Sequence, residues 1–245
     1  MGSSLGARGI GQTAVATSIM TFGDPIEDLY WIYRRQRVPA FVTVLTGRTP
    51  QEYIPELGRY RIYEGKEALL YLIVRSLRPE KVIETGVQFG WSSLAILAAM
   101  RENGVGSLHS IDLPFVGHGH LTTDGNFDDT HVNAISDTGR CVPEYLRSRW
   151  DLRIVADPEA STAELRRLVS EGPLDMFFHD SDHTYANMTL EYGIAWPALK
   201  PGGVLYSDDV DRNRALDDFA QSVGRTKRVF RIHPGKPPSL GGLRK

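Results

Sequence analysis

From Lys81 onward, short runs of apolar and β-branched residues alternate with stretches whose apolar residues recur at helical spacing. The short runs predict strands at 81–84, 107–112, 152–157, 175–180, 204–207 and 228–233, with a last edge strand at 240–245. The stretches between them predict helices at 92–100, 162–169, 190–199 and 211–223. Strands that alternate with helices are typical of βαβ units. The pattern therefore predicts an α/β fold with a Rossmann-like, doubly wound, mostly parallel sheet of about seven strands.

The chain before Lys81 has a different pattern. Residues 1–22 are rich in Gly, Ser, Ala and Thr, which predicts a flexible N-terminal arm. Asp24 and Pro25 predict a helix start, because Asp is a favoured N-cap and Pro is tolerated in the first turn. A second, apolar helix is predicted at 66–76. We therefore expect a helical N-terminal cap over 23–80, within one domain that spans 23–245.

The composition limits the class of protein. A chain of 245 residues with 41% hydrophobic and 24% charged residues fits one ordinary globular domain. Its formal net charge of -2 predicts no nucleic-acid partner. Without an apolar run of about 18 residues, we expect no membrane span. The single cysteine, Cys141, excludes a disulfide within the chain and suits a cytoplasmic protein.

The connection over 113–150 is too long for an ordinary crossover between a strand and a helix. It carries His118, His120 and His131 with several aspartates among glycines. Long loops in compact domains are usually functional or mobile. A solvated polar loop, a lid over the substrate and a second metal site all remain open, and the lid is the functional prediction for this insertion.

A glycine turn joins the first predicted strand of the sheet to the helix that follows. It contains Glu84, Gly86, Gly90 and Ser92. Glycines at such a turn let the backbone approach a ligand closely and present its amide groups. The spacing Glu-x-Gly-x-x-x-Gly differs from the dinucleotide fingerprint, which disfavours NAD, and an acid at the strand end suits a cationic or hydroxyl-bearing ligand. Asp112 closes the next strand, where it would bind both hydroxyls of a ribose or cap the strand.

Acidic residues also follow two later strands. Asp180 and His183 follow one of them, and Asp208 and Asp209 follow the other. Ligands of open α/β sheets bind outside the carboxyl ends of the strands, and three convergent carboxylates repel one another unless a cation lies between them. Other interpretations stay open: the aspartate pair would cap the next helix, His183 would cap a helix, or Asp182 would act in place of its neighbours.

With the turn over residues 200–203 before the fifth parallel strand, these features resemble the class I S-adenosylmethionine-dependent methyltransferases over residues 62–210. The resemblance implies that S-adenosylmethionine is bound by Gly86 and Gly90 at its methionine part, Ser92 near its carboxylate, Asp112 at the ribose and Asp157 near the adenine. Glu84 and Asp180 complete the predicted cofactor contacts.

Within that superfamily, the later strand ends look like the metal-dependent O-methyltransferases of the macrolide-sugar type and, more distantly, the catechol type. The resemblance implies that Asp180, Asp208 and Asp209 hold Mg²⁺, and that His183 is the general base, where catechol-type enzymes have a lysine. Carboxylate oxygens suit a hard ion such as Mg²⁺. The family also implies a small-molecule hydroxyl in natural-product biosynthesis, on a sugar, phenol or diol, and a homodimer or homotetramer. Asp209 stands where the catechol branch has asparagine, so a catechol substrate does not carry over.

Three other functions remain open from the sequence. They are a metal-independent N-methyltransferase, an iron-dependent hydroxylase that uses the loop histidines, and a ligand-binding protein of the same fold without chemistry. A protein that only binds needs neither a metal nor a base. The joint presence of Asp180, His183, Asp208 and Asp209 therefore favours an enzyme.

Overall fold

The computed structural model describes residues 59–60, 65–116, 120–121, 127–128, 134–230 and 239–245. The arm predicted at 1–22, the helix predicted at Asp24, and the loop residues His118 and His131 lie outside these ranges. The described helix of the predicted cap is α5 (Gly65–Leu77), which confirms the helix predicted at 66–76. Within the described ranges, no helix has the length and the apolar character that a membrane crossing requires.

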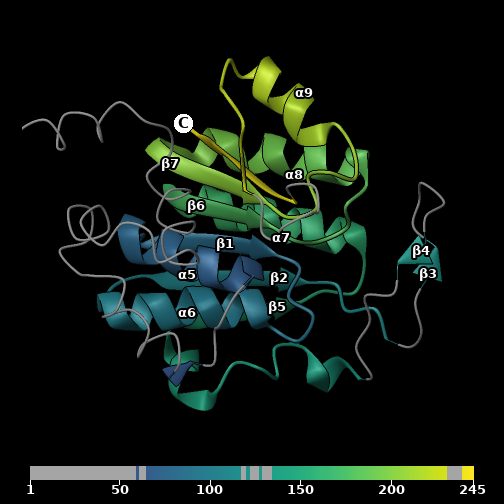
Figure 1. The fold of residues 1–245 in the computed structure, drawn as a ribbon. Helices are drawn as coiled ribbons and strands as arrows, with labels where there is room; N and C mark the ends of the chain where they lie inside the picture. Colours follow the sequence, from purple (N-terminus) through teal and green to yellow (C-terminus); the bar gives the residue numbers. More distant parts are fainter. Residues whose placement is uncertain (1–58, 61–64, 117–119, 122–126, 129–133, 231–238) are drawn as a thin grey trace, which may run out of the picture.

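Seven strands form one sheet in the order β5-β2-β1-β6-β7-β9-β8 (Figure 1). The strands are β1 (Lys81–Thr85), β2 (Ser107–Asp112), β5 (Trp150–Ile154), β6 (Leu174–His179), β7 (Leu199–Ser207), β8 (Arg228–Phe230) and β9 (Leu240–Arg244). The first five in the sheet order pair in parallel, and β9 pairs antiparallel with both β7 and β8. This confirms the predicted mostly parallel, doubly wound sheet.

Helices cover both faces of the sheet. Side chains alternate between these two faces along each strand, so neighbouring residues pack against different helices. Val82 and Phe178 pack in a core with α5 and α6 (Trp91–Asn103). Their neighbours Ile83 and Phe177 pack in a second core with α7 (Pro158–Ser170), α8 (Tyr185–Ala198) and α9 (Ala215–Ser222). A residue's position along a strand therefore decides which helices it meets.

The prediction that the strand at 240–245 lies at the edge of the sheet is wrong. It forms β9, which lies between β7 and β8, so that β8 is the edge strand. Gly242 pairs with Tyr206 on one side and with Arg228 on the other. A Cβ on Gly242 would lie 2.4 Å from the Tyr206 ring. Glycine weakens the strand pattern in the sequence, but its missing side chain leaves the room that this ring needs.

Several boundaries also differ from the predictions: α7 and α8 begin earlier than expected, β7 begins at Leu199, α9 begins later, and β8 ends at Phe230, the last residue described before 239. The strand expected at 152–157 runs from Trp150 to Ile154, because Asp157 caps the next helix. The insertion predicted at 113–150 therefore ends where β5 begins. Its described parts are the short antiparallel pair β3 (His120–Leu121) and β4 (Phe127–Asp128), and the 3₁₀ turns η1 (Ile135–Asp137) and η2 (Glu144–Arg149).

Candidate active site

The carboxyl ends of β1, β6 and β7 lie level with one another. Thr85 pairs with His179, and His179 pairs with Ser207. The next residues continue this alignment, because the Asp180 amide donates to the Thr85 carbonyl at 2.8 Å and the Asp208 amide donates to the His179 carbonyl at 2.9 Å. Alternation then places Asp180 and Asp208 on the side of α5, and His179 and Ser207 on the side of α8.

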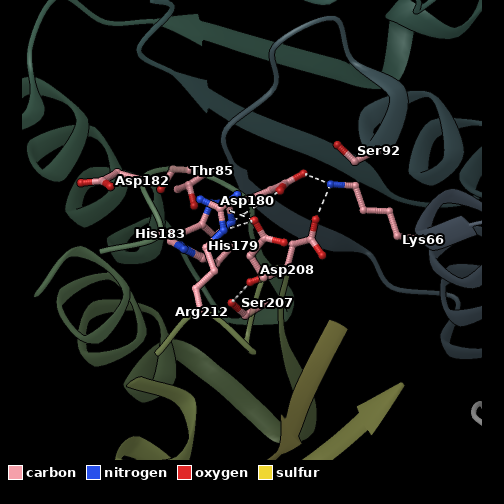
Figure 2. A network of polar contacts seen from close by, with 12 residues as sticks. Lys66, Thr85, Ser92, His179, Asp180, Asp182, His183, Ser207, Asp208 and Arg212 are labelled. Atoms are coloured by element: carbon pink, nitrogen blue, oxygen red, sulfur yellow. Dashed lines mark hydrogen bonds and ion pairs between the residues drawn. The ribbon is translucent and has the colours of Figure 1, made fainter. Parts of the chain in front are cut away.

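A lysine lies between the two aspartates that the sequence predicts to converge. Lys66, the second residue of α5, donates from Nζ to Oδ2 of Asp180 at 2.7 Å and to Oδ2 of Asp208 at 2.5 Å (Figure 2). The three side chains are only 24%, 16% and 12% exposed, so little water screens their attraction. The two carboxylates therefore converge as predicted, and a protein ammonium lies between them.

The pKa values in this group follow from burial and from the opposite charges. Burial favours a lower pKa for Lys66, but the two carboxylates outweigh it and raise that pKa above its ordinary value. Burial also raises the pKa of Asp180 well above its usual range. Burial favours the same for Asp208, but the Lys66 ammonium outweighs it and lowers the pKa of that carboxyl. Lys66 and Asp208 are therefore a charged pair at neutral pH.

Asp209 does not join this group. Its backbone has a φ of 49°, and its Oδ2 lies 2.7 Å from Nε of Arg212. Within the described part of the chain, no three His, Cys, Asp or Glu side chains converge on a position that could hold a metal ion. The structure therefore does not assemble Asp180, Asp208 and Asp209 as a magnesium site, because one acid pairs with an arginine and the other two with a lysine.

His183 lies between two carboxylates. Its Nε2 is 3.7 Å from Oδ1 of Asp180, and its Nδ1 is 3.8 Å from Oδ2 of Asp209. Burial, followed by the charge of His179, lowers the pKa of His183 to about 3, so the imidazole is neutral. Its Nε2 is buried without a hydrogen-bond partner among the described residues. A neutral imidazole with an unpaired nitrogen can accept a proton from a ligand.

Behind His183 lies a buried carboxylate and imidazole pair. His179 Nδ1 is 2.7 Å from Oε2 of Glu191 on α8, and Glu191 also accepts hydrogen bonds from Thr85 at 2.5 Å and from Ser181 at 2.9 Å. Burial acts to raise the pKa of Glu191, but His179 and these donors outweigh it and lower that pKa. The rings of His179 and His183 meet edge to face at 5.4 Å. His179 therefore supports the site from the opposite side of β6, as the alternation of side chains predicts.

Glu84, a predicted cofactor contact, is enclosed by serines. The side chain is fully buried, and it accepts hydrogen bonds from the hydroxyls of Ser92, Ser93 and Ser110, each at 2.6 Å. Burial raises the pKa of its carboxyl. Ser92 is itself buried and donates to Glu84. Both side chains thus fasten the start of α6 to β1 and β2, beneath the glycine turn.

Asp112 has one oxygen in use and one without a partner. Its Oδ1 accepts from the backbone amides of Val87 at 2.7 Å and Gln88 at 3.3 Å, which fixes the glycine turn. Its Oδ2 is buried and has no hydrogen-bond partner among the described residues. Burial raises the pKa of this carboxyl. A hydroxyl donor from a ligand would satisfy the free oxygen.

Glycine is required at positions 86 and 90, because a side chain there would collide with neighbouring backbone. Gly86 has a φ of +82°, and a Cβ there would lie 2.0 Å from the carbonyl oxygen of Asp180. Gly90 has a φ of +85°, and a Cβ there would lie 2.9 Å from Cα of Gly139. The turn is thus pressed against the end of β6 on one side and against the segment before η2 on the other.

Two other predicted residues have local structural roles. Asp157 caps α7, because its Oδ1 accepts from the Ala160 amide at 2.7 Å. Asp182 is exposed and accepts two hydrogen bonds from Thr184, both at 3.1 Å. Figure 2 shows Asp182 well away from Lys66, on the far side of His183. The structure therefore does not place Asp182 with the other acids.

Residues 83–210, just over half of the chain, match the family described as a methyltransferase domain. The chain belongs to this methyltransferase family. Among curated proteins, none matches it in sequence.

Solved structures support the fold of this methyltransferase. A Klebsiella pneumoniae protein classed as an O-methyltransferase has a TM-score of 0.54 at 16% identity, covering 94% of this chain and 93% of that one. TomG from Streptomyces achromogenes, in complex with S-adenosylmethionine, has a TM-score of 0.52 at 14% identity, covering 94% and 93%. The calicheamicin methyltransferase CalS11 has a TM-score of 0.51 at 15% identity, covering 99% of each chain. These likenesses confirm the predicted class I methyltransferase fold.

Sequence reasoning missed two residues that shape the site of this methyltransferase. Lys66 stands at the start of a helix, where the helix dipole disfavours a cation, and that mismatch is the signal that it serves something outside the helix. Glu191 lies inside a mostly apolar helix and is buried, so its charge needs a partner on the sheet. Both features of the sequence indicate that the residue needs a partner of opposite charge, but they do not show which residue that partner is.

Proposed function

We propose that this methyltransferase transfers a methyl group from S-adenosylmethionine to a hydroxyl of a small molecule, with His183 as the general base. Two buried atoms that lack a partner among the described residues carry the proposal, namely Oδ2 of Asp112 and Nε2 of His183. Each lies at the carboxyl end of a parallel strand, and each can accept a hydrogen bond from a hydroxyl. One suits a ribose hydroxyl of the cofactor, and the other suits the hydroxyl that becomes methylated.

The residues around Asp112 fit this cofactor. One oxygen of Asp112 has no partner among the described residues while the other holds the glycine turn, so the acid is fixed before binding. The start of α6 follows at once, and the amide groups of a helix start attract a carboxylate. When bound, S-adenosylmethionine supplies an electrophilic methyl group on a sulfonium. Gly86, Gly90 and Asp112 would hold it, with Glu84 and Ser92 supporting the turn from within.

The methyl transfer needs one proton to move. The acceptor hydroxyl gives its proton to Nε2 of His183, its oxygen forms the bond to the methyl carbon, and the bond from carbon to sulfur breaks with the electron pair left on sulfur. This requires the tautomer of His183 that carries its proton on Nδ1, the nitrogen facing Asp209. Asp180 and Asp209 lie beside the two nitrogens of the ring, and the charge of Asp208, which acts to raise the pKa of His183, would stabilise the imidazolium.

The magnesium ion predicted from the family does not fit the residues as they are arranged. Mg²⁺ requires several oxygen ligands at about 2.0–2.1 Å in octahedral geometry. The space between Asp180 and Asp208 is filled by the ammonium of Lys66, and Asp209 pairs with Arg212. No step of the proposed reaction therefore passes through a metal ion.

For the acceptor, we propose the hydroxyl of a sugar, phenol or diol in a natural product. Two proteins of similar fold support this choice: TomG is involved in tomaymycin synthesis, and CalS11 is a calicheamicin methyltransferase. We also propose a homodimer or homotetramer, which light scattering of the purified protein would test.

Calorimetry with S-adenosylmethionine tests the cofactor site. We expect Asp112→Asn to weaken binding about 10- to 100-fold, because it replaces a charged acceptor with an amide group. Asp157→Asn is the matched control, since asparagine is an equally good N-cap. If Asp157→Asn weakens binding as much as Asp112→Asn, Asp157 contacts the adenine as the family resemblance implies, and its role is not confined to capping α7. If the wild-type protein does not bind S-adenosylmethionine, the proposed function fails.

Release of S-adenosylhomocysteine with panels of hydroxyl and amine acceptors tests the chemistry. We expect turnover with a hydroxyl acceptor, and a loss of about 100-fold or more in kcat for His183→Asn with unchanged cofactor affinity. Turnover with amines alone would replace the proposal with N-methyl transfer. Oxidation of an acceptor that depends on iron and 2-oxoglutarate would replace it with hydroxylation.

A further inference from the structure

The side chain of Lys66 reaches across the molecule to the ends of two central strands. Its partners lie 114 and 142 residues further along the chain, on the residues that follow β6 and β7. The lysine is at the start of α5, where the helix dipole opposes a positive charge. Neither the helix dipole nor the packing of α5 in the core explains a cation at this position. The two carboxylates explain it, because they need a positive charge between them.

The ammonium and a divalent ion would require the same place. Nζ of Lys66 is within 2.7 Å of one carboxylate and 2.5 Å of the other, so it lies between them. An ion bound by the same two oxygens would be in contact with Nζ, and two cations at that distance repel strongly when they are buried. Occupation by Lys66 and occupation by a metal are therefore mutually exclusive.

The ammonium also has a hydrogen-bond donor to spare. A lysine ammonium carries three N–H donors. Two go to Asp180 and Asp208, and the described residues offer no acceptor for the third. The side chain is 24% exposed, so the third donor is within reach of a ligand. His183 Nε2 lies 3.7 Å from the other oxygen of Asp180, so the ammonium and the proposed proton acceptor lie at opposite oxygens of one carboxylate.

We propose that Lys66 is the built-in cation of this active site, standing in place of a divalent metal and donating its third N–H to the acceptor oxygen. The second part rests on the proposed O-methyl transfer. As the hydroxyl loses its proton to His183, negative charge develops on the oxygen, and a fixed ammonium nearby stabilises that charge. The first part concerns cation binding and is independent of the reaction.

Binding of Mn²⁺, followed by the loss of its free electron paramagnetic resonance signal, tests the first part without any turnover. We expect no stoichiometric binding of Mn²⁺ to the wild-type protein at a Mn²⁺ concentration of about 1 mM, because a dissociation constant above that value corresponds to weak binding. Lys66→Met removes the charge at similar length, and we expect it to bind Mn²⁺ at least about tenfold more tightly than the wild type, through Asp180 and Asp208. Lys66→Arg keeps the charge and should not gain this affinity. Lys200→Met removes a lysine that pairs with Asp175 at 2.9 Å, away from the site, and should behave as wild type.

The wild-type titration carries the test even if Lys66→Met does not fold. Stoichiometric Mn²⁺ binding to the wild type that is lost in Asp208→Asn overturns the proposal. A folded Lys66→Met variant that gains no affinity overturns it as well.

Turnover tests the second part. We expect wild-type turnover to be unaffected by a chelator, kcat to fall about 100-fold in Lys66→Met, and Mn²⁺ to restore part of it in that variant. Turnover abolished by the chelator in the wild type, or unchanged kcat in Lys66→Met, overturns this part. If the wild type neither binds S-adenosylmethionine nor turns over any acceptor, the proposed function has failed, and the Mn²⁺ titrations still decide the role of Lys66.

Discussion

Two groups of buried carboxylates lie on the side of the sheet that faces α5 and α6, and they are compensated in different ways. Glu84 is surrounded by three serine hydroxyls. Asp180 and Asp208 share the ammonium of Lys66. The serine hydroxyls each have one donor and use it on Glu84, whereas the Lys66 ammonium keeps a third N–H donor that a ligand can share. The first group therefore fits a structural role, and the second fits a chemical one.

The largest effect should come from Glu84→Ala. It leaves three buried hydroxyls without their acceptor, and we expect it to lower the free energy of unfolding by roughly 3–5 kcal/mol. Asp208→Ala should lower it by only about 1–2 kcal/mol, because Lys66 keeps Asp180 as a partner. Urea unfolding of both variants measures the difference. An equal or larger loss in Asp208→Ala would break the comparison.

A smaller effect is expected where the two groups are connected, at Gly86. Gly86→Ala places a Cβ 2.0 Å from the Asp180 carbonyl at a positive φ, and we expect a loss of about 3 kcal/mol in the free energy of unfolding. Gly104→Ala is the control, because Gly104 has a similar φ of +73° with nothing within 4 Å. It should lose only about 1 kcal/mol. Similar urea midpoints for the two variants would show that the backbone contact with Asp180 is not tight.

The smallest effect should be a pH dependence of the free energy of unfolding that arises from His183, which lies beside Asp180. His183 has a pKa of about 3 in the folded protein, against its ordinary 6.5 when unfolded. Between these values the unfolded chain binds a proton that the folded chain does not, so stability falls as the pH falls. For this one group the loss should be about 1 kcal/mol between pH 6 and pH 5.

Unfolding of His183→Asn over the same pH range isolates this contribution. The free energy of unfolding of the variant should fall less steeply than that of the wild type. Parallel curves for the two proteins would mean that His183 is not held neutral by burial in the folded protein.

Most of the fold could be predicted from the sequence, because each parallel strand is a compact apolar run followed by a turn. The strand at 107–112 agrees at both ends with β2. The predictions failed where a residue's role depends on distant contacts. Asp157 looks like the end of a strand until its hydrogen bond to Ala160 shows a helix cap, and β9 looks like an edge strand until the sheet order shows β8 outside it.

The site was predicted in the same uneven way. Asp180 and Asp208 follow neighbouring strands, so their convergence could be predicted, and the register of β6 and β7 confirms it. Local sequence gave no means of knowing what would lie between them, since Lys66 is more than a hundred residues away. It also did not reveal that Asp209 would turn to Arg212, three residues later in the chain.

The main chain of Gly86 lies directly against the Asp180 carbonyl, so the glycine turn, where we propose that the methyl donor binds, touches the strand end where we propose that the acceptor binds. A ligand that shifts the turn by a few tenths of an ångström displaces the carbonyl behind it, and with it the carboxylate that Lys66 holds. On the proposed function, the affinities of the two substrates would then be linked, and by thermodynamic reciprocity each would change the other by the same factor. Gly86 would thus connect the proposed donor and acceptor sites as well as form a turn.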